Sequence, residues 1–310
     1  MLAGIIAGIT WALETVILSI ALGMEPLQSA VLATFVSTFI HDACSAIWAL
    51  GYNGVRGKLK AVWRALMTKS GKWVVVAAII GGPIGMTGYV LTVNYMGAAI
   101  GAIASAIFPA IGSVLAFFFL KEKMKWHQWV FLIATLLGVL GLSWTPDLEI
   151  TNFWIGIVGA LMCSFGWGIE AVILAKCLKD PEVTDEYALQ IRQTTSALFN
   201  GIIILPILGG WGLTAQLFTT NTGWLLPTII IAAFFATVSY LFYYKAIAQI
   251  GASKAMALNV TYTAWAILFT VLILRDISVL NPLTIGCAIV VLVCGIFAAA
   301  DFKQILSKEK

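Results

Sequence analysis

Four ionisable residues fall well inside long apolar stretches of the sequence, where a charge is costly. They are Glu14, His41, Asp42 and Glu170. A charged side chain near the centre of a bilayer costs about 2.5–3.5 kcal/mol on insertion scales, so such groups usually face a polar cavity. A carboxylate in a cavity can bind a cation or a proton. These residues therefore predict a cation or proton site, with a purely structural role for each as the alternative.

A tryptophan precedes each of the two glutamates by one helical turn. Trp11 and Glu14 recur as Trp167 and Glu170, 156 residues further along the chain. Residues three apart share a face of a helix, so each pair presents an indole beside a carboxylate. An indole face attracts cations, and several rings around a cation form the arrangement that holds quaternary ammonium groups such as choline. The two pairs predict a binding site for a small cationic substrate.

Six further aromatic residues are candidates for the same substrate-binding cavity. Tryptophan and tyrosine also concentrate at membrane interfaces, so an interfacial position is the alternative for each of them. The candidates are Tyr240, Tyr262, Trp265, Tyr244, Tyr89 and Trp48.

Glu14, His41 and Asp42 are candidates for coupling to protons. Histidine changes charge between about pH 5 and 8, and a desolvated carboxylate can be shifted into that range. Neighbouring positions on a helix point about 100° apart, so we expect no shared contact between His41 and Asp42. A buried pair that only holds its helix in place is the alternative.

These residues must be positioned by membrane-spanning helices. The 310 residues are 61% hydrophobic and only 10% charged, whereas a soluble domain carries about 25% charged residues. A water-soluble domain is therefore excluded. Apolar runs predict ten transmembrane helices and leave no room for a folded extramembrane domain. The runs span about 3–22, 27–50, 73–96, 98–120, 126–145, 152–175, 187–210, 224–247, 252–274 and 280–300.

The basic residues predict the orientation of these helices. If the N-terminus is cytoplasmic, 17 of the 18 lysines and arginines, Arg192 among them, lie on the cytoplasmic side, and Arg275 is the exception. Cytoplasmic loops are rich in Lys and Arg, so both termini are predicted to be cytoplasmic. This topology accounts for the net charge of +4 without a nucleic-acid partner. No Lys or Arg is expected deep in a span, which counts against anionic substrates.

The segment from Arg56 to Lys72 is basic and contains Trp63 and Trp73. It is either an interfacial helix on anionic membrane lipids or a solvated loop. The sequence leaves both alternatives open.

The sequence contains an internal repeat. At an offset of 154 residues, Gly97 matches Gly251, and Lys121-Glu122 matches Arg275-Asp276. We therefore predict two five-helix repeats, residues 1–148 and 149–310, within one integral membrane domain. Because five is odd, the second repeat enters the membrane from the opposite side, as in many secondary transporters.

Three other features bear on shape and cofactors. The Gly81–Gly85 segment is expected to open the third helix, and Pro109 lies in the middle of the fourth; both can kink a helix. Thr263 occupies the position equivalent to Pro109, so the ninth helix is expected to be straighter than the fourth. The five cysteines form no CxxC pair, and neither a metal site nor a cofactor is predicted.

The whole pattern resembles the drug/metabolite transporter superfamily in its EamA-like ten-helix branch. Five-plus-five helices, short loops and the Gly97 and Gly251 segments carry the resemblance. The pairs Trp11-Glu14 and Trp167-Glu170, with the many aromatic residues, make it most similar to bacterial choline permeases of the LicB type. This implies import of choline or a related quaternary ammonium compound across a bacterial plasma membrane, driven by the membrane potential and by protons.

Other functions are weighed against this one. Proton-antiport export of cationic drugs or metabolites would use the same carboxylates in the opposite direction. An intramembrane enzyme is disfavoured because no His-x-x-x-His or equivalent spacing exists. A receptor or scaffold is disfavoured because no extramembrane domain is predicted. The expected partners are thus choline, protons and lipids, with a monomer favoured.

Overall fold

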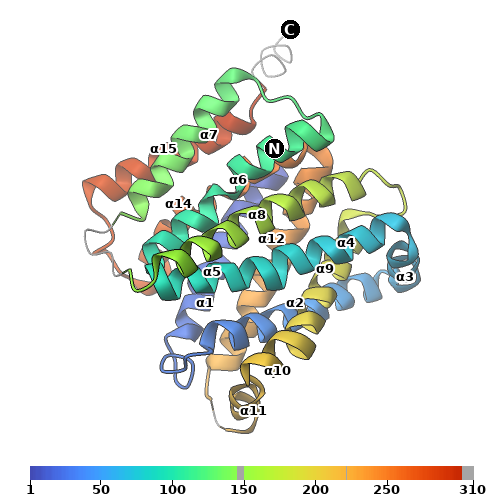
Figure 1. The fold of residues 1–310 in the computed structure, drawn as a ribbon, viewed down its shortest axis with the longest axis vertical. Coiled ribbons are helices and arrows are strands. Elements are labelled where there is room, and N and C mark those ends of the chain that lie inside the picture. The colour runs from blue at the N-terminus through green and yellow to red at the C-terminus, as the bar shows by residue number, and fades with distance from the viewer. Residues whose placement is uncertain (145–149, 221, 302–310) are drawn as a thin grey trace.

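Figure 1 shows a computed structural model of the chain, which describes residues 1–144, 150–220 and 222–301. These described residues form helices and turns, with no β-strand among them. Nine of their helical segments are long and apolar enough to cross a membrane. The predicted all-α membrane architecture is therefore confirmed.

The helical segments correspond to the predicted apolar runs, with shifted ends. The largest shift is in α2, which runs from Ala33 to Val55. The run predicted at 126–145 forms α7, a shorter apolar helix of 17 residues. The elements are α1 (Leu2–Leu22), α2 (Ala33–Val55), α3 (Leu59–Met67), α4 (Lys69–Ile79), η1 (Ile80–Ile84), α5 (Gly85–Met96), α6 (Ala98–Leu120), α7 (Trp126–Leu142), α8 (Phe153–Cys177), α9 (Asp185–Phe199), η2 (Asn200–Ile204), α10 (Leu205–Leu208), α11 (Trp211–Thr219), α12 (Leu225–Ile250), α13 (Ala252–Asn259), α14 (Tyr262–Phe269), η3 (Thr270–Leu274) and α15 (Pro282–Ala299).

The two helices that carry the Trp–Glu pairs lie in the middle of the molecule. Helix α1 packs along α12 and against α14, and α8 packs along α5 and α6. Two other pairs, α7 with α15 and α2 with α9, lie on opposite sides of these helices (Figure 1). Both Trp–Glu helices are thus surrounded by other helices, which gives their polar side chains protein neighbours in place of lipid.

The positions aligned by the sequence repeat adopt the same backbone conformations. Gly97 and Gly251 precede α6 and α13, each with a φ of 86°, a value that glycine reaches without steric cost. Lys121 and Arg275 end α6 and η3 in the left-handed region, with φ of 61° and 57°. The segments 97–121 and 251–275 therefore begin and end in the same way.

A carboxylate joins the end of α6 to the start of α13. The Oε1 atom of Glu122 accepts a hydrogen bond of 3.0 Å from the backbone N–H of Ala252. The Oε2 atom accepts from the backbone N–H and the hydroxyl of Ser253, at 3.1 and 3.0 Å. A negative charge at a helix N-terminus is favourable because it pairs with unsatisfied N–H groups. Glu122 thus fastens two segments far apart in the sequence.

The segment 252–274 is less regular than its counterpart, so the prediction of a straighter ninth helix is wrong. Helix α6 continues through Pro109, whereas Val260 and Thr261 separate α13 from α14. The hydroxyl of Thr261 donates to the carbonyl of Leu258 at 2.6 Å, and that of Thr263 to the carbonyl of Val260 at 3.1 Å. Such side-chain bonds compete with the helical backbone pattern. The helix with the proline is therefore continuous, and the interrupted helix is the one in which threonine hydroxyls bond to the backbone.

Part of the basic segment Arg56–Lys72 is helical. Helix α3 is followed after Thr68 by α4, and the hydroxyl of Thr68 accepts a hydrogen bond from the N–H of Gly71 at 2.9 Å. The side chain of Trp63 is 63% exposed. The helical alternative for this segment is confirmed, and its position on lipid stays a prediction.

Glycines bring α5 and α8 into close contact. A Cβ atom on Gly88 would lie 2.6 Å from the carbonyl oxygen of Gly159, and one on Gly159 would lie 2.6 Å from that of Gly88. Small residues allow this approach of two helix backbones.

Replacing Gly88 with valine should lower the melting temperature of the purified protein. The added side chain must separate α5 from α8, and overpacking of this kind costs about 1–3 kcal/mol. Thermal unfolding in detergent measures the effect. Gly286→Val on α15 is the matched control, since a Cβ there meets nothing within 4 Å. Equal melting temperatures for the two variants would contradict the prediction.

Candidate functional site

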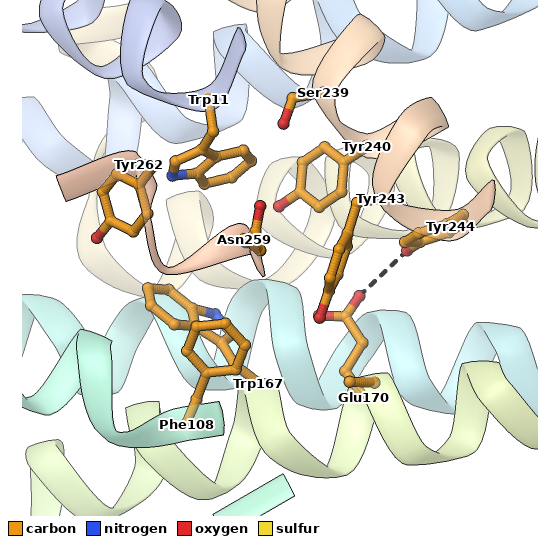
Figure 2. A pocket seen from close by; sticks show the side chains of 11 residues that line it. Trp11, Phe108, Trp167, Glu170, Ser239, Tyr240, Tyr243, Tyr244, Asn259 and Tyr262 are labelled. Carbon is orange, nitrogen blue, oxygen red and sulfur yellow. Dashed lines mark hydrogen bonds between the residues drawn. The ribbon is translucent and has the colours of Figure 1, made fainter. Parts of the chain in front are cut away.

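An aromatic pocket lies between the two Trp–Glu helices. Figure 2 shows Trp11, Tyr240 and Tyr262 on one side of it and Trp167 and Phe108 on the other. Seven aromatic residues line it. Among the described residues, Glu170 is the one charged residue of the lining. The lining consists of Trp11, Phe108, Trp167, Glu170, Ala171, Ser239, Tyr240, Tyr243, Tyr244, Asn259 and Tyr262.

The aromatic rings of the pocket contact one another mostly edge to face. The centroids of Trp11 and Tyr240 are 4.9 Å apart with an interplanar angle of 89°. The rings of Trp167 and Phe108 are 6.0 Å apart at 88°. Edge-to-face contacts are the favourable arrangement for such rings. They hold the rings in fixed orientations around the pocket.

A π-helical turn positions Trp167 and Glu170. The indole Nε1 of Trp167 donates a hydrogen bond of 2.8 Å to the carbonyl of Gly81, which lies in η1 within the membrane segment 69–96. A Cβ atom on Gly81 would overlap Oε2 of Glu170, and one on Gly85 would lie 3.0 Å from the Trp167 ring. The glycine-rich segment was predicted to open its helix, but it lies in the interior of the span. There its lack of side chains allows the backbone to approach the pocket.

Glu170 is one end of a chain of buried ionisable side chains. Arg192 on α9 donates from Nε to Oε1 of Glu170 at 3.0 Å, and its Nη1 lies 3.9 Å from Oδ1 of Asp42. His41 joins Asp42 to Glu14, with its Nδ1 3.2 Å from Oδ1 of Asp42 and its Nε2 3.4 Å from Oε1 of Glu14. All five side chains are buried. Four of the five were identified from the sequence, and Arg192 was not.

Two predictions about these residues are wrong. His41 and Asp42 do share a contact, with Nδ1 of His41 3.2 Å from Oδ1 of Asp42, because the two side chains bend toward each other while His41 also faces Glu14 on α1 and Asp42 faces Ser196 on α9. Arg192 is not a residue of a cytoplasmic loop, since its side chain is 3% exposed within α9. The expectation that no Lys or Arg lies deep in a span therefore fails, and with it the argument against anionic groups that relied on it.

The cluster carries an excess of negative charge. The guanidinium of Arg192 lies between the carboxylates of Asp42 and Glu170, and the third carboxylate, that of Glu14, faces His41. Three acidic groups therefore stand against at most two positive ones, the guanidinium and a protonated His41. In a medium of low dielectric constant, such an excess attracts a cation or a proton strongly. The cluster and the pocket together can therefore hold a positive charge.

Six of the predicted substrate-binding residues line the pocket, and the others do not. Those in the lining are Trp11, Trp167, Glu170, Tyr240, Tyr244 and Tyr262. Glu14 faces His41, while Tyr89 stacks on Trp167 with ring centroids 6.4 Å apart. Trp48 is 42% exposed and contacts Phe234 and the carbonyl of Ile230 on α12. Trp265 is half-buried, and its Nε1 has no hydrogen-bond partner among the described residues.

The structure also adds lining residues that the sequence did not indicate. Tyr243 lies beside the predicted Tyr244, and their rings are 6.2 Å apart. Asn259 is the last residue of α13, directly before the break at Val260 and Thr261. No proline or glycine marks this break in the sequence, so only a polar residue in an apolar run could have indicated Asn259. Phe108, Ala171 and Ser239 give no such signal.

This fold and site define a membrane transporter. The chain belongs to the EamA-like transporter family of the drug/metabolite transporter superfamily, whose model matches residues 1–144 and 154–300. It is similar to Protein LicB of Haemophilus influenzae, with 29% identity over 277 residues and 86% of each chain covered. A protein of known crystal structure has the same fold, with a TM-score of 0.71 over 96% of each chain at 13% identity. These similarities point to a transporter and away from an enzyme.

Gly81→Ala should weaken the binding of a small cation such as tetramethylammonium. The added methyl group overlaps Oε2 of Glu170 and must displace the carboxylate from the pocket, so we expect about tenfold weaker binding. The shift of the melting temperature with tetramethylammonium concentration measures the affinity. Gly286→Ala on α15 is the control, because its methyl group has no neighbour within 4 Å. Unchanged affinity in Gly81→Ala would contradict this account of η1.

Proposed function

We propose that the protein imports choline or a closely related quaternary ammonium compound by alternating access. The observation that carries the proposal is the lining of the pocket, in which seven aromatic rings surround a space beside one carboxylate, that of Glu170. A quaternary ammonium group has no N–H to donate, so it gains little from hydrogen-bond acceptors. Aromatic faces attract it through their quadrupoles, and the carboxylate neutralises its charge.

The membrane potential supplies a driving force in the direction of import. An inside-negative potential contributes about 2.3 kcal/mol per charge per 100 mV to cation entry. The negative charge shared by Glu14, Asp42 and Glu170 lowers the cost of bringing a cation into the membrane interior. We take the bacterial plasma membrane as the location and the cytoplasm as the side of both termini, on the strength of 16 basic residues against one once the buried Arg192 is left out.

Two inverted repeats of five helices, residues 1–148 and 149–310, are part of this proposal. The equal backbone conformations at Gly97 and Gly251 and at Lys121 and Arg275 support it. The pocket takes residues from α1 and α12 and also from α6 and α8. A site between two such repeats can be exposed to either side when one repeat rocks against the other.

Choline is the substrate that the sequence resemblance favours within the quaternary ammonium class. The resemblance to LicB-type permeases depends on Trp11-Glu14 and Trp167-Glu170, and the similarity to Protein LicB covers 86% of the chain. Three of these four residues line the pocket.

Trp167→Ala should raise the KM for choline uptake about 30-fold. A desolvated cation–π contact contributes about 2 kcal/mol, which corresponds to that factor. Tracer uptake into proteoliposomes, with the potential and the pH gradient set separately, measures it. Trp48→Ala is the matched control, since that indole lies against α12 outside the pocket.

The same vesicles distinguish the proposal from its alternative. Saturable choline uptake that follows an inside-negative potential supports import. The choline assignment would be overturned if active vesicles exchanged other cations for protons while choline neither moved nor competed. That result would favour export of cationic drugs or metabolites.

We further propose that Glu14 and His41 couple transport to protons. The two side chains are 3.4 Å apart and buried, and Asp42 contacts the other nitrogen of the imidazole. A proton added to this group reduces its negative charge, which changes the cost of holding a cation nearby.

Glu14→Gln should remove the response of choline uptake to an inward proton gradient and leave uptake driven by the potential. The amide keeps the shape of the carboxylate but cannot titrate. Initial rates with and without the gradient measure the effect. Glu25→Gln is the control, because Glu25 is in a turn where it accepts a hydrogen bond from Ser29. An undiminished gradient response in Glu14→Gln would exclude Glu14 from coupling.

A further inference from the structure

A cation of the protein's own lies beside the pocket, against two of its lining residues. The guanidinium of Arg192 lies 4.6 Å above the ring of Tyr240 and donates to Glu170 at 3.0 Å. Tyr240 and Glu170 both line the pocket. One aromatic face and one carboxylate are the groups that a quaternary ammonium substrate would need there. Arg192 therefore uses the contacts that the substrate requires.

We propose that Arg192 is a tethered counter-cation that competes with the substrate for Glu170 and is displaced toward Asp42 when the substrate binds. This inference rests on the proposed function, because it concerns how the same pocket accepts a cation. It assigns a specificity role to a residue that does not belong to the pocket lining.

A second carboxylate makes the displacement inexpensive. Nη1 of Arg192 is 3.9 Å from Oδ1 of Asp42, so the guanidinium lies between two acids and is closer to one of them. Asp42 is held in place by the hydroxyl of Ser196, which donates at 2.5 Å, and by His41. A buried guanidinium without a partner would be strongly unfavourable. With Asp42 beside it, Arg192 can leave Glu170 and remain paired.

The exchange keeps charges paired in both states of the site. In the empty pocket, Arg192 neutralises Glu170, so no isolated carboxylate faces the apolar interior. In the occupied pocket, the substrate neutralises Glu170 and Asp42 neutralises Arg192. A neutral molecule of the same shape cannot replace the guanidinium on Glu170. The arrangement therefore selects for positive charge as well as for size.

The test is equilibrium binding to the purified protein in detergent, measured by calorimetry. The ligands are choline and 3,3-dimethylbutan-1-ol, which has the shape of choline without its charge. Arg192→Gln should bind choline about tenfold more tightly than wild type, because Glu170 loses its competitor, and should bind the neutral alcohol unchanged. Arg56→Gln is the matched control, since Arg56 also pairs with an acid on α9, Glu186, but outside the pocket.

A second variant should shift the affinity in the opposite direction. Asp42→Asn removes the acceptor of the displaced guanidinium, so choline binding should weaken about tenfold. Both effects should fall below about twofold in a Glu170→Gln background, where there is no carboxylate to compete for. A long-range charge effect would persist in that background, and general damage to the fold would weaken choline binding in both variants. If Arg192→Gln does not fold, the Asp42→Asn pair still tests the inference.

The outcomes separate this inference from the proposed function. Choline binding to wild type with no opposite shifts in the two variants, or with shifts that persist without Glu170, overturns the counter-cation role and leaves the proposed function standing. If wild type binds tetramethylammonium but not choline, the choline assignment fails, and the same variants measured with tetramethylammonium decide the role of Arg192.

Discussion

The ion pair between Arg192 and Glu170 determines how the centre of the molecule is built. A carboxylate in the membrane interior needs a partner, and α9 supplies a guanidinium at 3.0 Å. The pair links α8 to α9 through long side chains, and Gly81 and Gly82 let η1, which contacts both helices, approach them, since a Cβ on Gly82 would lie 2.5 Å from the hydroxyl of Ser196. The aromatic pocket then forms beside the pair, with Trp167 fixed by its hydrogen bond to Gly81. Removing the guanidinium would leave the buried carboxylate of Glu170 without a compensating charge, which is destabilising.

The repeated Trp–Glu motif does not produce two equivalent sites. Glu170 lines the pocket and pairs with arginine, whereas Glu14 faces His41. Trp11 and Trp167 both line the pocket, so the aromatic half of the motif retains its symmetry while the acidic half does not. Helices α2 and α9, which lie beside each other, account for the difference. One brings an acid and a histidine, and the other brings a base.

The sequence was sufficient to predict the helical spans and the acidic residues, because both depend on local properties. A carboxylate within an apolar run is conspicuous whatever the tertiary structure. Arg192 was not predicted because its surroundings, from Asp185 to Thr195, are polar and resemble the end of a helix. Its burial arises because α9 packs against α2, α4 and α12, which no local pattern encodes. Likewise, the break after Asn259 depends on hydroxyl groups that commonly occur within intact helices.

The hydrogen bonds of Glu122 bear on which parts of the molecule can move. Three donors from Ala252 and Ser253 converge on one carboxylate, and hydrogen bonds to a charged group contribute about 1.5–3 kcal/mol each. These hydrogen bonds therefore connect the end of α6 firmly to the start of α13, although 130 residues separate the bonded groups. Movement of one repeat against the other must therefore either pivot about this connection or break its hydrogen bonds, and the irregular stretches at η1 and at Val260–Thr261 are where the helices are already interrupted.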